Sequence, residues 1–191
     1  ELKVDFTAVA AVDQRLVPKF LTLKKGNCFI ASNAENRSET YQFAVLNDVV
    51  SPVINNICLI SNQDSNDNLR VIEGVYLTFN FIVDDTIPNQ KFIIPTGNLD
   101  TETIRVNVRD NANSSSLTRF EKVTNILDVS ADDPVFFVQE IDDSRYELIF
   151  GDGVLGKALK DGEVIEVSYL TSSGENGNNI KNFVFSGEIY N

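Results

Sequence analysis

Apolar and polar residues alternate with a period of two along much of the chain. The alternation is clearest in YLTFNFIV (76–83), ETIRVNVR (102–109), RYELIF (145–150) and EVIEVSYL (163–170). Because successive side chains of a strand point to opposite faces, each segment predicts a half-buried strand. The inward rows are expected to be Leu77, Phe79, Phe81 and Val83; Ile104, Val106 and Val108; Tyr146, Leu148 and Phe150; and Ile165, Val167 and Tyr169. In the second segment, the outward row is expected to be Thr103, Arg105, Asn107 and Arg109.

Clusters of Gly, Asn, Asp, Ser and Pro separate these segments at short, regular intervals. Such spacing is typical of β-sandwiches and β-barrels. The best candidate for a helix, SLTRFEKVTNIL (116–127), fits a strand equally well. The sequence therefore predicts an all-β chain with two small antiparallel β domains of the sandwich or barrel type, long hairpins and little helix.

The polar segment DDTIPNQ (84–90) contains a proline and no glycine, and it marks the predicted domain boundary. We expect an N-terminal β domain over residues 1–86 and a second β domain over 87–175. Residues 176–191 are expected to form an exit segment with a terminal strand that leads to a missing C-terminal region. The absence of Met and the start within an apparent strand, ELKVDFTAV, indicate a piece of a longer protein.

The net charge and the lengths of the apolar runs limit the kinds of molecule that the protein is expected to bind. The chain has 191 residues and a formal net charge of −12, and an acidic field of this size repels phosphate backbones. We therefore expect no nucleic-acid partner. No apolar run approaches the length of a membrane-spanning helix, so no membrane partner is expected either. Cys28 and Cys58 lie among apolar neighbours, which predicts buried free thiols.

The titratable residues offer little for catalysis. The chain has no histidine, which removes Ser-His-Asp, Cys-His and the common His-containing zinc sites. Asp favours turns because its carboxylate binds nearby backbone amides, whereas a pairing of distant carboxylates stays open. We expect no enzyme activity, no cofactor, no metal and no small-molecule substrate. The adjacent acidic pairs predicted as turn residues are Asp84-Asp85, Asp132-Asp133 and Asp142-Asp143.

One polar segment resembles half of a calcium loop. DSNDN (64–68) supplies the first ligand positions, but Leu69 stands where the loop needs Gly and Val75 where it needs Glu. An ordinary polar hairpin loop is therefore favoured, with weak surface binding of calcium left open. Asn36 and Asn113 fit the N-glycosylation pattern, which matters only in a secreted eukaryotic protein.

The segment FGDGVLGK (150–157) matches most of a phosphate-binding loop. Such a loop needs a helix after its lysine, yet only ALKDGE (158–163) separates it from the next predicted strand. Ala158 also replaces the Ser or Thr that would bind Mg²⁺. We therefore predict a structural turn, in which glycine adopts positive φ and an aspartate accepts hydrogen bonds from nearby amides. The predicted turn residues are Phe150, Gly151, Asp152, Gly153 and Gly156.

A longer segment around this turn carries a family resemblance. RYELIFGDGVLGKALKDGEVIEVSYLTSSGENGN (145–178) resembles the baseplate wedge proteins of T-even-like contractile-tail phages, which are relatives of the baseplate-J family. Their signature is R-Y-E-L-x-F-G-D-G-x-x-G-K-x-L-x-x-G, followed by a strand and a Gly-containing segment. The matching residues are Phe150, Gly151, Asp152, Gly153, Gly156, Lys157, Leu159 and Gly162. Further stretches that fit are 91–110, 135–143, 20–29 and 41–49.

The resemblance implies a structural protein of the virion. It implies a component of the tail baseplate wedge that acts as a protein–protein assembly module and is assembled in the host cytoplasm. The implied partners are other wedge proteins, with a homodimer in the full-length protein. An alternative is a carbohydrate- or receptor-binding β module of a tail fibre or adhesin, which exposed aromatic side chains would favour. A carboxylate-pair enzyme is a further alternative.

Overall fold

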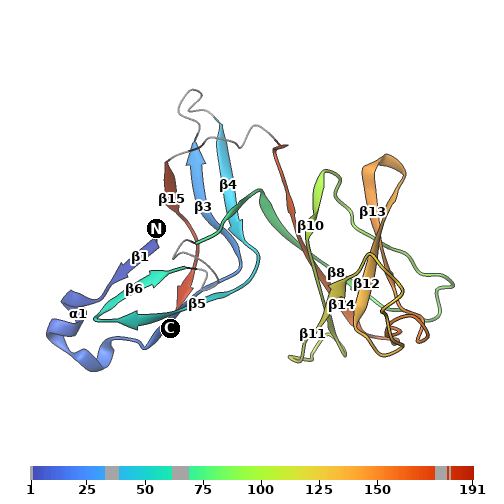
Figure 1. The fold of residues 1–191 in the computed structure, drawn as a ribbon, viewed down its shortest axis with the longest axis horizontal. Coiled ribbons are helices and arrows are strands. Elements are labelled where there is room, and N and C mark those ends of the chain that lie inside the picture. The colour runs from blue at the N-terminus through green and yellow to red at the C-terminus, as the bar shows by residue number, and fades with distance from the viewer. Residues whose placement is uncertain (1, 33–38, 62–68, 175–179, 181) are drawn as a thin grey trace. The chain divides into compact units, whose positions relative to one another are not determined.

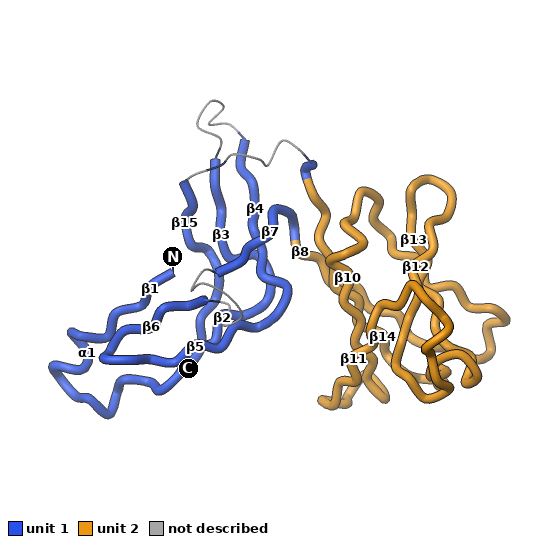
Figure 2. The backbone as a smooth tube through the Cα atoms, in the orientation of Figure 1, with its two compact units in different colours: residues 1–75, 173–191 blue, residues 76–172 orange. Residues whose placement is uncertain are grey.

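The computed structural model describes residues 2–32, 39–61, 69–174, 180 and 182–191, and β-strands make up most of the chain (Figure 1). The prediction of an all-β fold is confirmed. The chain divides into two compact units, one of residues 1–75 with 173–191 and one of residues 76–172 (Figure 2). The chain passes from one unit to the other twice, so the second unit is an insertion within the first.

Unit 1 is a sandwich of two antiparallel sheets with strand orders β1-β6-β5-β2-β16 and β15-β3-β4-β7. Both sheets contribute to one core, which contains the two cysteines as buried free thiols, as predicted. The buried members of this core are Leu21, Leu23, Cys28, Val45, Cys58 and Ile60. The elements of unit 1 are β1 (Leu2–Asp5), α1 (Thr7–Val12), the 3₁₀ turn η1 (Gln14–Leu16), β2 (Phe20–Leu23), β3 (Gly26–Ser32), β4 (Thr40–Val45), β5 (Val49–Ile54), β6 (Ile57–Ile60), β7 (Ile72–Glu73), β15 (Phe183–Phe185) and β16 (Ile189–Tyr190).

The first strand is shorter than the sequence predicts. β1 ends at Asp5, whose carboxylate accepts hydrogen bonds from the backbone amide of Thr7 at 2.9 Å and from its hydroxyl at 2.6 Å. This turn leads into α1 and interrupts the alternation of ELKVDFTAV. Among the described residues, no helix has the length and apolar character needed to cross a membrane.

The described C-terminal residues belong to unit 1 and include the expected terminal strand, so they do not stand apart from the two units. β15 pairs with β3 and β16 pairs with β2, both in antiparallel register. Between these strands, the amide of Ser186 donates to the carbonyl of Cys28 at 2.9 Å. A Cβ on Gly187 would lie 2.8 Å from the Cβ of Cys28, so the chain passes directly over the core there.

Unit 2 is built from one seven-stranded sheet with the order β8-β14-β10-β11-β12-β13-β9. β11 and β12 run parallel, which is an exception to the predicted antiparallel arrangement. The elements of unit 2 are β8 (Val75–Ile82), β9 (Phe92–Ile93), β10 (Leu99–Arg109), β11 (Thr118–Lys122), β12 (Val135–Ile141), the 3₁₀ turn η2 (Asp142–Ser144), β13 (Arg145–Phe150) and β14 (Val164–Thr171).

The two edges of this sheet meet, so the sheet forms a nearly closed barrel. β8 and β9 lie at opposite ends of the strand order but follow each other in sequence. Phe81 of β8 and Phe92 of β9 contact edge to face, with ring centroids 5.6 Å apart. Residues 84–90 therefore form the loop that joins the edges of one barrel and are not a linker between domains. The boundary lies at 75/76, whereas the sequence suggests 86/87.

Most of the predicted inward rows lie in the barrel core. Ile104, Val106, Val108, Leu148, Ile165, Val167 and Tyr169 are buried there, with Tyr146 and Phe150 packed against them. Phe79 is an exception, because it is an exposed residue of the edge strand β8. Among the described aromatic pairs, its ring contacts only that of Phe81, two residues further along the same strand.

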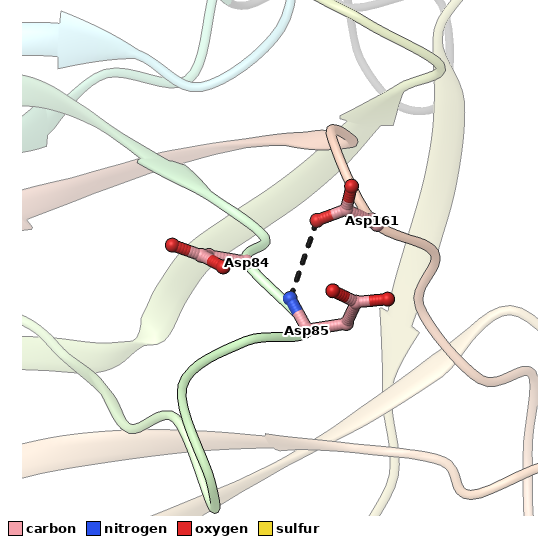
Figure 3. A group of neighbouring side chains, drawn as sticks. All are labelled: Asp84, Asp85 and Asp161. Carbon is pink, nitrogen blue, oxygen red and sulfur yellow. Dashed lines mark hydrogen bonds between the residues drawn. The ribbon is translucent and has the colours of Figure 1, made fainter.

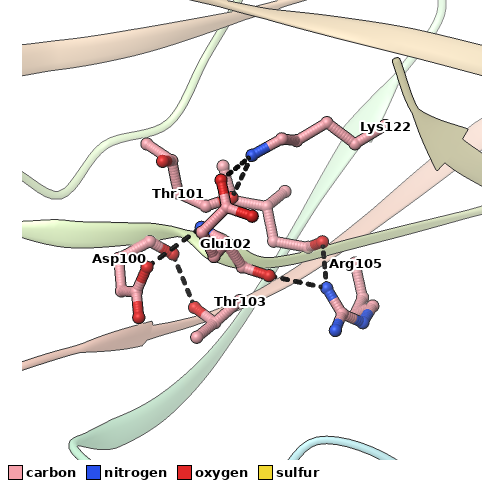
Figure 4. A network of polar contacts seen from close by, with 7 residues as sticks. Asp100, Thr101, Glu102, Thr103, Arg105 and Lys122 are labelled. Carbon is pink, nitrogen blue, oxygen red and sulfur yellow. Dashed lines mark hydrogen bonds and ion pairs between the residues drawn. The ribbon is translucent and has the colours of Figure 1, made fainter. Parts of the chain in front are cut away.

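Thr103 is buried, although the alternation places it on the outward row. The β10–β14 register shifts between Asp100 and Arg105, and this irregularity turns Thr103 inward. Its hydroxyl donates to the carbonyl of Asp100 at 2.6 Å (Figure 4). The same hydroxyl accepts from the amide of Leu170 at 3.0 Å. Within the same irregular stretch, the Glu102 carboxylate binds the Lys122 ammonium (Figure 4).

Candidate functional site

The FGDG turn follows β13 at one end of the barrel. Phe150, the last residue of β13, anchors the turn through edge-to-face contacts of its ring with Phe92 and Phe120, at centroid distances of 5.5 and 5.7 Å. It also packs at 6.4 Å from Phe136. Four aromatic rings from four strands therefore fix the point at which the chain leaves the barrel.

Hydrogen bonds within the protein engage every backbone amide from 153 to 157. The Asp152 carboxylate accepts from the amides of residues 154 and 155, both at 2.9 Å. The amide of Gly153 donates to the carbonyl of Gly156 at 3.0 Å. The amides of Gly156 and Lys157 donate to residues 130 and 133 at 3.1 and 2.8 Å. The amide hydrogen bonds also lower the pKa of Asp152 from its ordinary value, because they stabilise the carboxylate.

Glycine is needed in this turn for two different reasons. Gly153 and Gly156 have positive φ, 86° and 84°. Gly151 is not among the positive-φ glycines, but a Cβ there would lie 2.2 Å from the carbonyl carbon of Gly156. The expected positive φ is thus found at Gly153, while a close backbone approach accounts for Gly151.

The turn lacks the architecture of a phosphate-binding loop. Residues 151–163, all of which the structure describes, contain no helix. The amides that would cradle a phosphate already have acceptors in the protein, as described above. The ammonium of Lys157 lies 6.0 Å from the ring centroid of Phe120, which places it beside the barrel. The residues therefore form a structural turn.

An open groove of about 370 Å³ lies next to this turn. Its walls come from the 83–92 loop, β13 and residues 158–159, and they combine apolar side chains such as Phe92 with carboxylates. The acidic residues that line it are Asp84, Asp85 and Glu147. Glu147 is paired with the Lys91 ammonium at 3.2 Å. The described lining residues include no Ser, Thr, Cys or Lys, so they supply no side-chain nucleophile besides the carboxylates.

Three carboxylates gather beside the groove: those of Asp84, Asp85 and Asp161 (Figure 3). One oxygen of each lies within 4.8 Å of the others, and carboxylate oxygens are ligands that calcium prefers. Their contacts are those of turn residues, because Asp84 accepts from the amide of Thr86 at 3.0 Å and Asp161 from the amide of Asp85 at 3.2 Å. Within the described part of the chain, these three residues form the group that could hold a cation, and their closeness is the feature that favours it. Sequence spacing gave no signal that Asp161 would join the pair.

The other predicted acidic pairs lie in turns. Asp133 accepts from the amide of Ser130 at 2.8 Å, and Asp142 and Asp143 form η2 before β13. The calcium-like segment 64–68 and the glycosylation pattern at Asn36 lie outside the described residues.

The outer face of the five-stranded sheet in unit 1 is apolar, which sequence analysis did not predict. Cross-strand partners share a face, so the register joins these side chains into one surface. The pairs Phe20–Pro52, Thr22–Val50, Tyr190–Thr22, Ile54–Ile57 and Lys3–Leu59 define it, and we call it the outer sheet face. Its exposed large apolar residues are Phe20, Val50, Ile54, Leu59 and Tyr190. The sequence VVSPVI of β5 could have indicated this surface, because it has apolar residues at both odd and even positions and so on both faces of the strand.

No protein-family model matches the chain, and a search of curated proteins finds no similar sequence.

Proposed function

We propose that the chain is a structural protein–protein assembly module without catalytic activity. The observation that carries this proposal is the outer sheet face of unit 1. An antiparallel sheet with one face on the core commonly presents polar residues on the other face, to water. Contiguous exposed apolar surface on a folded protein marks a site of interaction.

The size of the outer sheet face suits the centre of an interface. The five strands hold two to six residues each, with a rise of about 3.3 Å per residue and a spacing of about 4.8 Å between strands. The sheet therefore offers roughly 300 Å² in projection, at the lower end of the size range of functional patches on protein surfaces. A complete interface buries about 800 Å² on each partner, so the surrounding loops would contribute its rim.

Charge at the outer sheet face is mostly paired, in a chain of net charge −12. Beside Tyr190, the Lys24 ammonium lies 5.9 Å from the ring centroid and pairs with Asp48 at 2.7 Å. The Glu188 carboxylate accepts from the Tyr190 hydroxyl at 2.6 Å. The charged residues of its register rows are Lys3 and Asp5, whose ammonium and carboxylate lie 3.9 Å apart. Burial against a partner would therefore remove little unpaired charge from water, and removing such charge is the main electrostatic cost of association.

We further propose that the assembly is a phage tail baseplate, with the chain as part of a wedge protein in the virion. The resemblance of residues 145–178 to baseplate wedge proteins supports this, as does the structural character of the FGDG turn within that segment. The proposed partners are other wedge proteins, and the full-length protein is proposed to be a homodimer.

The experiment compares two matched substitutions in the full-length protein. Ile54→Lys places a charge on the outer sheet face, at a residue that is 64% exposed and ends β5. Ile82→Lys is the control, at a residue that is 62% exposed and ends β8 in unit 2. Each variant is mixed with the proteins encoded by neighbouring genes, and complexes are detected by native mass spectrometry.

We expect wild type and Ile82→Lys to join a discrete complex and Ile54→Lys to weaken it at least tenfold. If Ile54→Lys assembles as well as wild type, the outer sheet face is not the assembly surface. If the wild-type protein joins none of these neighbours and instead binds glycans on an array, the carbohydrate-binding alternative replaces the assembly role.

A further inference from the structure

Two loops of unit 2 are tied together at the end of the barrel. One is residues 123–134, between β11 and β12, and the other is residues 151–157, after β13. The amide of Gly156 donates to the carbonyl of Ser130 at 3.1 Å, and the amide of Lys157 donates to the carbonyl of Asp133 at 2.8 Å. The two loops therefore form one continuous surface, which we call the paired-loop surface.

Each loop presents an adjacent pair of large apolar side chains to solvent. These are Ile126 and Leu127 in the first loop and Val154 and Leu155 in the second. Leu127 is 85% exposed and Val154 is 72% exposed, and none of the four belongs to the barrel core. Burial in the fold therefore does not explain these apolar side chains, whereas burial against another molecule would.

Local hydrogen bonds hold both loops in place. The side chain of Asn125 accepts from the amide of Leu127 at 3.1 Å, and the carboxylate of Asp133 accepts from the amide of Ser130 at 2.8 Å. Asp152 binds two amides of the second loop in the same way. A surface that is already ordered loses less conformational entropy on binding than a flexible one.

The same two loops carry exposed acidic residues close in sequence to the apolar side chains. Asp128 and Asp132 are exposed in the first loop and Asp152 in the second. The Asp152 carboxylate is ionised at neutral pH, because the amides of Leu155 and Val154 lower its pKa further below the ordinary value of 3.8. The one basic residue within the two loops is Lys157, whose ammonium lies beside the Phe120 ring. The paired-loop surface thus combines exposed apolar side chains with net negative charge.

We propose that the paired-loop surface docks into an apolar pocket rimmed by Lys and Arg on a partner protein. Complementary charge accelerates encounter and selects the partner, while the buried apolar side chains supply affinity. At these loops, the same acidic surface of a second copy would be repelled, and so would an anionic membrane. The inference rests on the proposed assembly role and specifies the chemistry of one partner surface.

The test uses a synthetic peptide as the probe. A 12-residue peptide of alternating Leu and Lys is titrated into the ¹⁵N-labelled chain, and amide chemical shifts are followed by NMR. Peptides of alternating Ser and Lys, and of alternating Leu and Glu, are titrated as controls. We expect shifts confined to residues 123–134 and 151–157 with the Leu-Lys peptide, at least tenfold weaker binding of both controls, and further weakening in salt.

Variants then locate the binding. The double variant Leu127→Ser, Val154→Ser and the charge reversal Asp128→Lys should each lower the affinity for the Leu-Lys peptide at least fivefold. Ile82→Ser, at an exposed isoleucine of the same unit, should leave it unchanged. Thermal melts check that each variant is folded. If one of the two loop variants fails to fold, the other still tests the inference.

Three results would overturn the inference: unchanged binding in both loop variants, equal binding of the Leu-Glu peptide, or shifts that map outside the two loops. The variant Ile54→Lys distinguishes failure of this inference from failure of the proposed assembly function. If the loop variants bind normally while Ile54→Lys still disrupts the wedge complex, the paired-loop inference fails and the proposed function stands.

Discussion

A Cβ atom on Gly151 would lie 2.2 Å from the carbonyl carbon of Gly156, five residues along the chain. The backbones come this close because Gly151 forms a parallel bridge with Ala158, so the loop between them folds back upon its own start. Gly156 is itself crowded, since a Cβ there would lie 2.8 Å from Cγ2 of Val135. The absence of a side chain at both glycines therefore allows β13, the turn and β12 to pack closely at one point.

Gly151→Ala should destabilise unit 2 severely. The added methyl group meets backbone atoms, which cannot move aside without breaking the bridge to Ala158. We expect a loss of roughly 3 kcal/mol or more in the free energy of unfolding, at the upper end of overpacking costs. Urea denaturation followed by circular dichroism measures it.

Gly153→Ala and Gly162→Ala are the matched controls. Both glycines have positive φ, but a Cβ would be 3.8 Å from its nearest neighbour at Gly153 and would meet nothing within 4 Å at Gly162. Each should cost only about 1 kcal/mol, the backbone penalty of a left-handed conformation. Equal losses at all three positions would show that close approach at Gly151 is unimportant.

Asp152→Asn should remove a pH-dependent part of the stability. Two amides bind the carboxylate, which places its pKa in the folded chain below the ordinary value of 3.8. A lowered pKa stabilises the folded state above the unfolded pKa, and this stability is lost as pH falls through the folded pKa. The difference in unfolding free energy between wild type and Asp152→Asn should therefore be constant above about pH 5 and shrink below about pH 4. A constant difference down to about pH 2 would contradict the assignment.

Nucleotide should not stabilise the protein. The amides of residues 153–157 all donate to acceptors within the chain, so they are not available to a phosphate. We expect equal melting temperatures with and without ATP and Mg²⁺. Lys157→Ala should lower stability by about 1 kcal/mol at most, through the lost contact with the Phe120 ring. A rise of several degrees with ATP that Lys157→Ala abolishes would restore the phosphate-loop interpretation.

The two thiols should resist modification in the folded protein. Cys28 and Cys58 are both buried in the core of unit 1. Burial raises the pKa of Cys28 to about 11, because the thiolate is poorly solvated there, and it raises the pKa of Cys58 as well. At about pH 8, a disulfide reagent should react slowly with the native chain and rapidly with two thiols in urea. Rapid native reaction would show that unit 1 opens readily.

The same pKa shift gives a direction for alkaline stability. A thiol whose pKa is raised in the folded state contributes stability below its unfolded pKa, near 9, which is lost as pH rises toward 11. Cys28→Ala should therefore flatten the decline of stability over that window, although its cavity lowers stability at neutral pH. Parallel declines in wild type and variant would contradict this.

Local pattern predicted the strands far better than their pairing. The alternation in residues 102–109 and 163–170 correctly placed Val106 and Val167 in the barrel core, because side-chain direction in a strand depends only on the period of two. Thr103 was misplaced because a register irregularity reverses that direction, and nothing in ETIRVNVR marks it.

The alternation of apolar and polar residues could not predict which distant parts of the chain lie side by side. The pairing of β16 with β2 joins Tyr190 to Thr22, and no periodicity records such a partner. For the same reason, Asp161 was not expected beside Asp84. The turn chemistry of Asp152 was predictable, because an aspartate that binds amides two and three residues ahead acts within its own segment.

Residues 76–172 should fold alone, because they hold every strand of the barrel, with β8 lacking only its first residue, Val75. β8, at the start of this segment, lies beside β14, at its end, so the new termini emerge from neighbouring strands. The hydroxyls of Thr78 and Ser168 join the two strands by a hydrogen bond of 3.1 Å. We expect the isolated segment to show a β circular dichroism spectrum and a single cooperative thermal transition.

The segment 87–175, which the sequence alone suggested as a domain, is the control and should not fold cooperatively. It lacks β8, and with it Leu77, Phe81 and Val83, which pack in the barrel core. Val83 is buried, whereas Leu77 and Phe81 are partly buried. Fully burying a large apolar side chain contributes about 1.5–3 kcal/mol, so losing these three removes roughly 3 kcal/mol or more, a large part of the stability of a small domain. The barrel would also lose the edge that meets Phe92. Cooperative unfolding of 87–175 with a melting temperature equal to that of 76–172 would show that β8 is not part of the barrel.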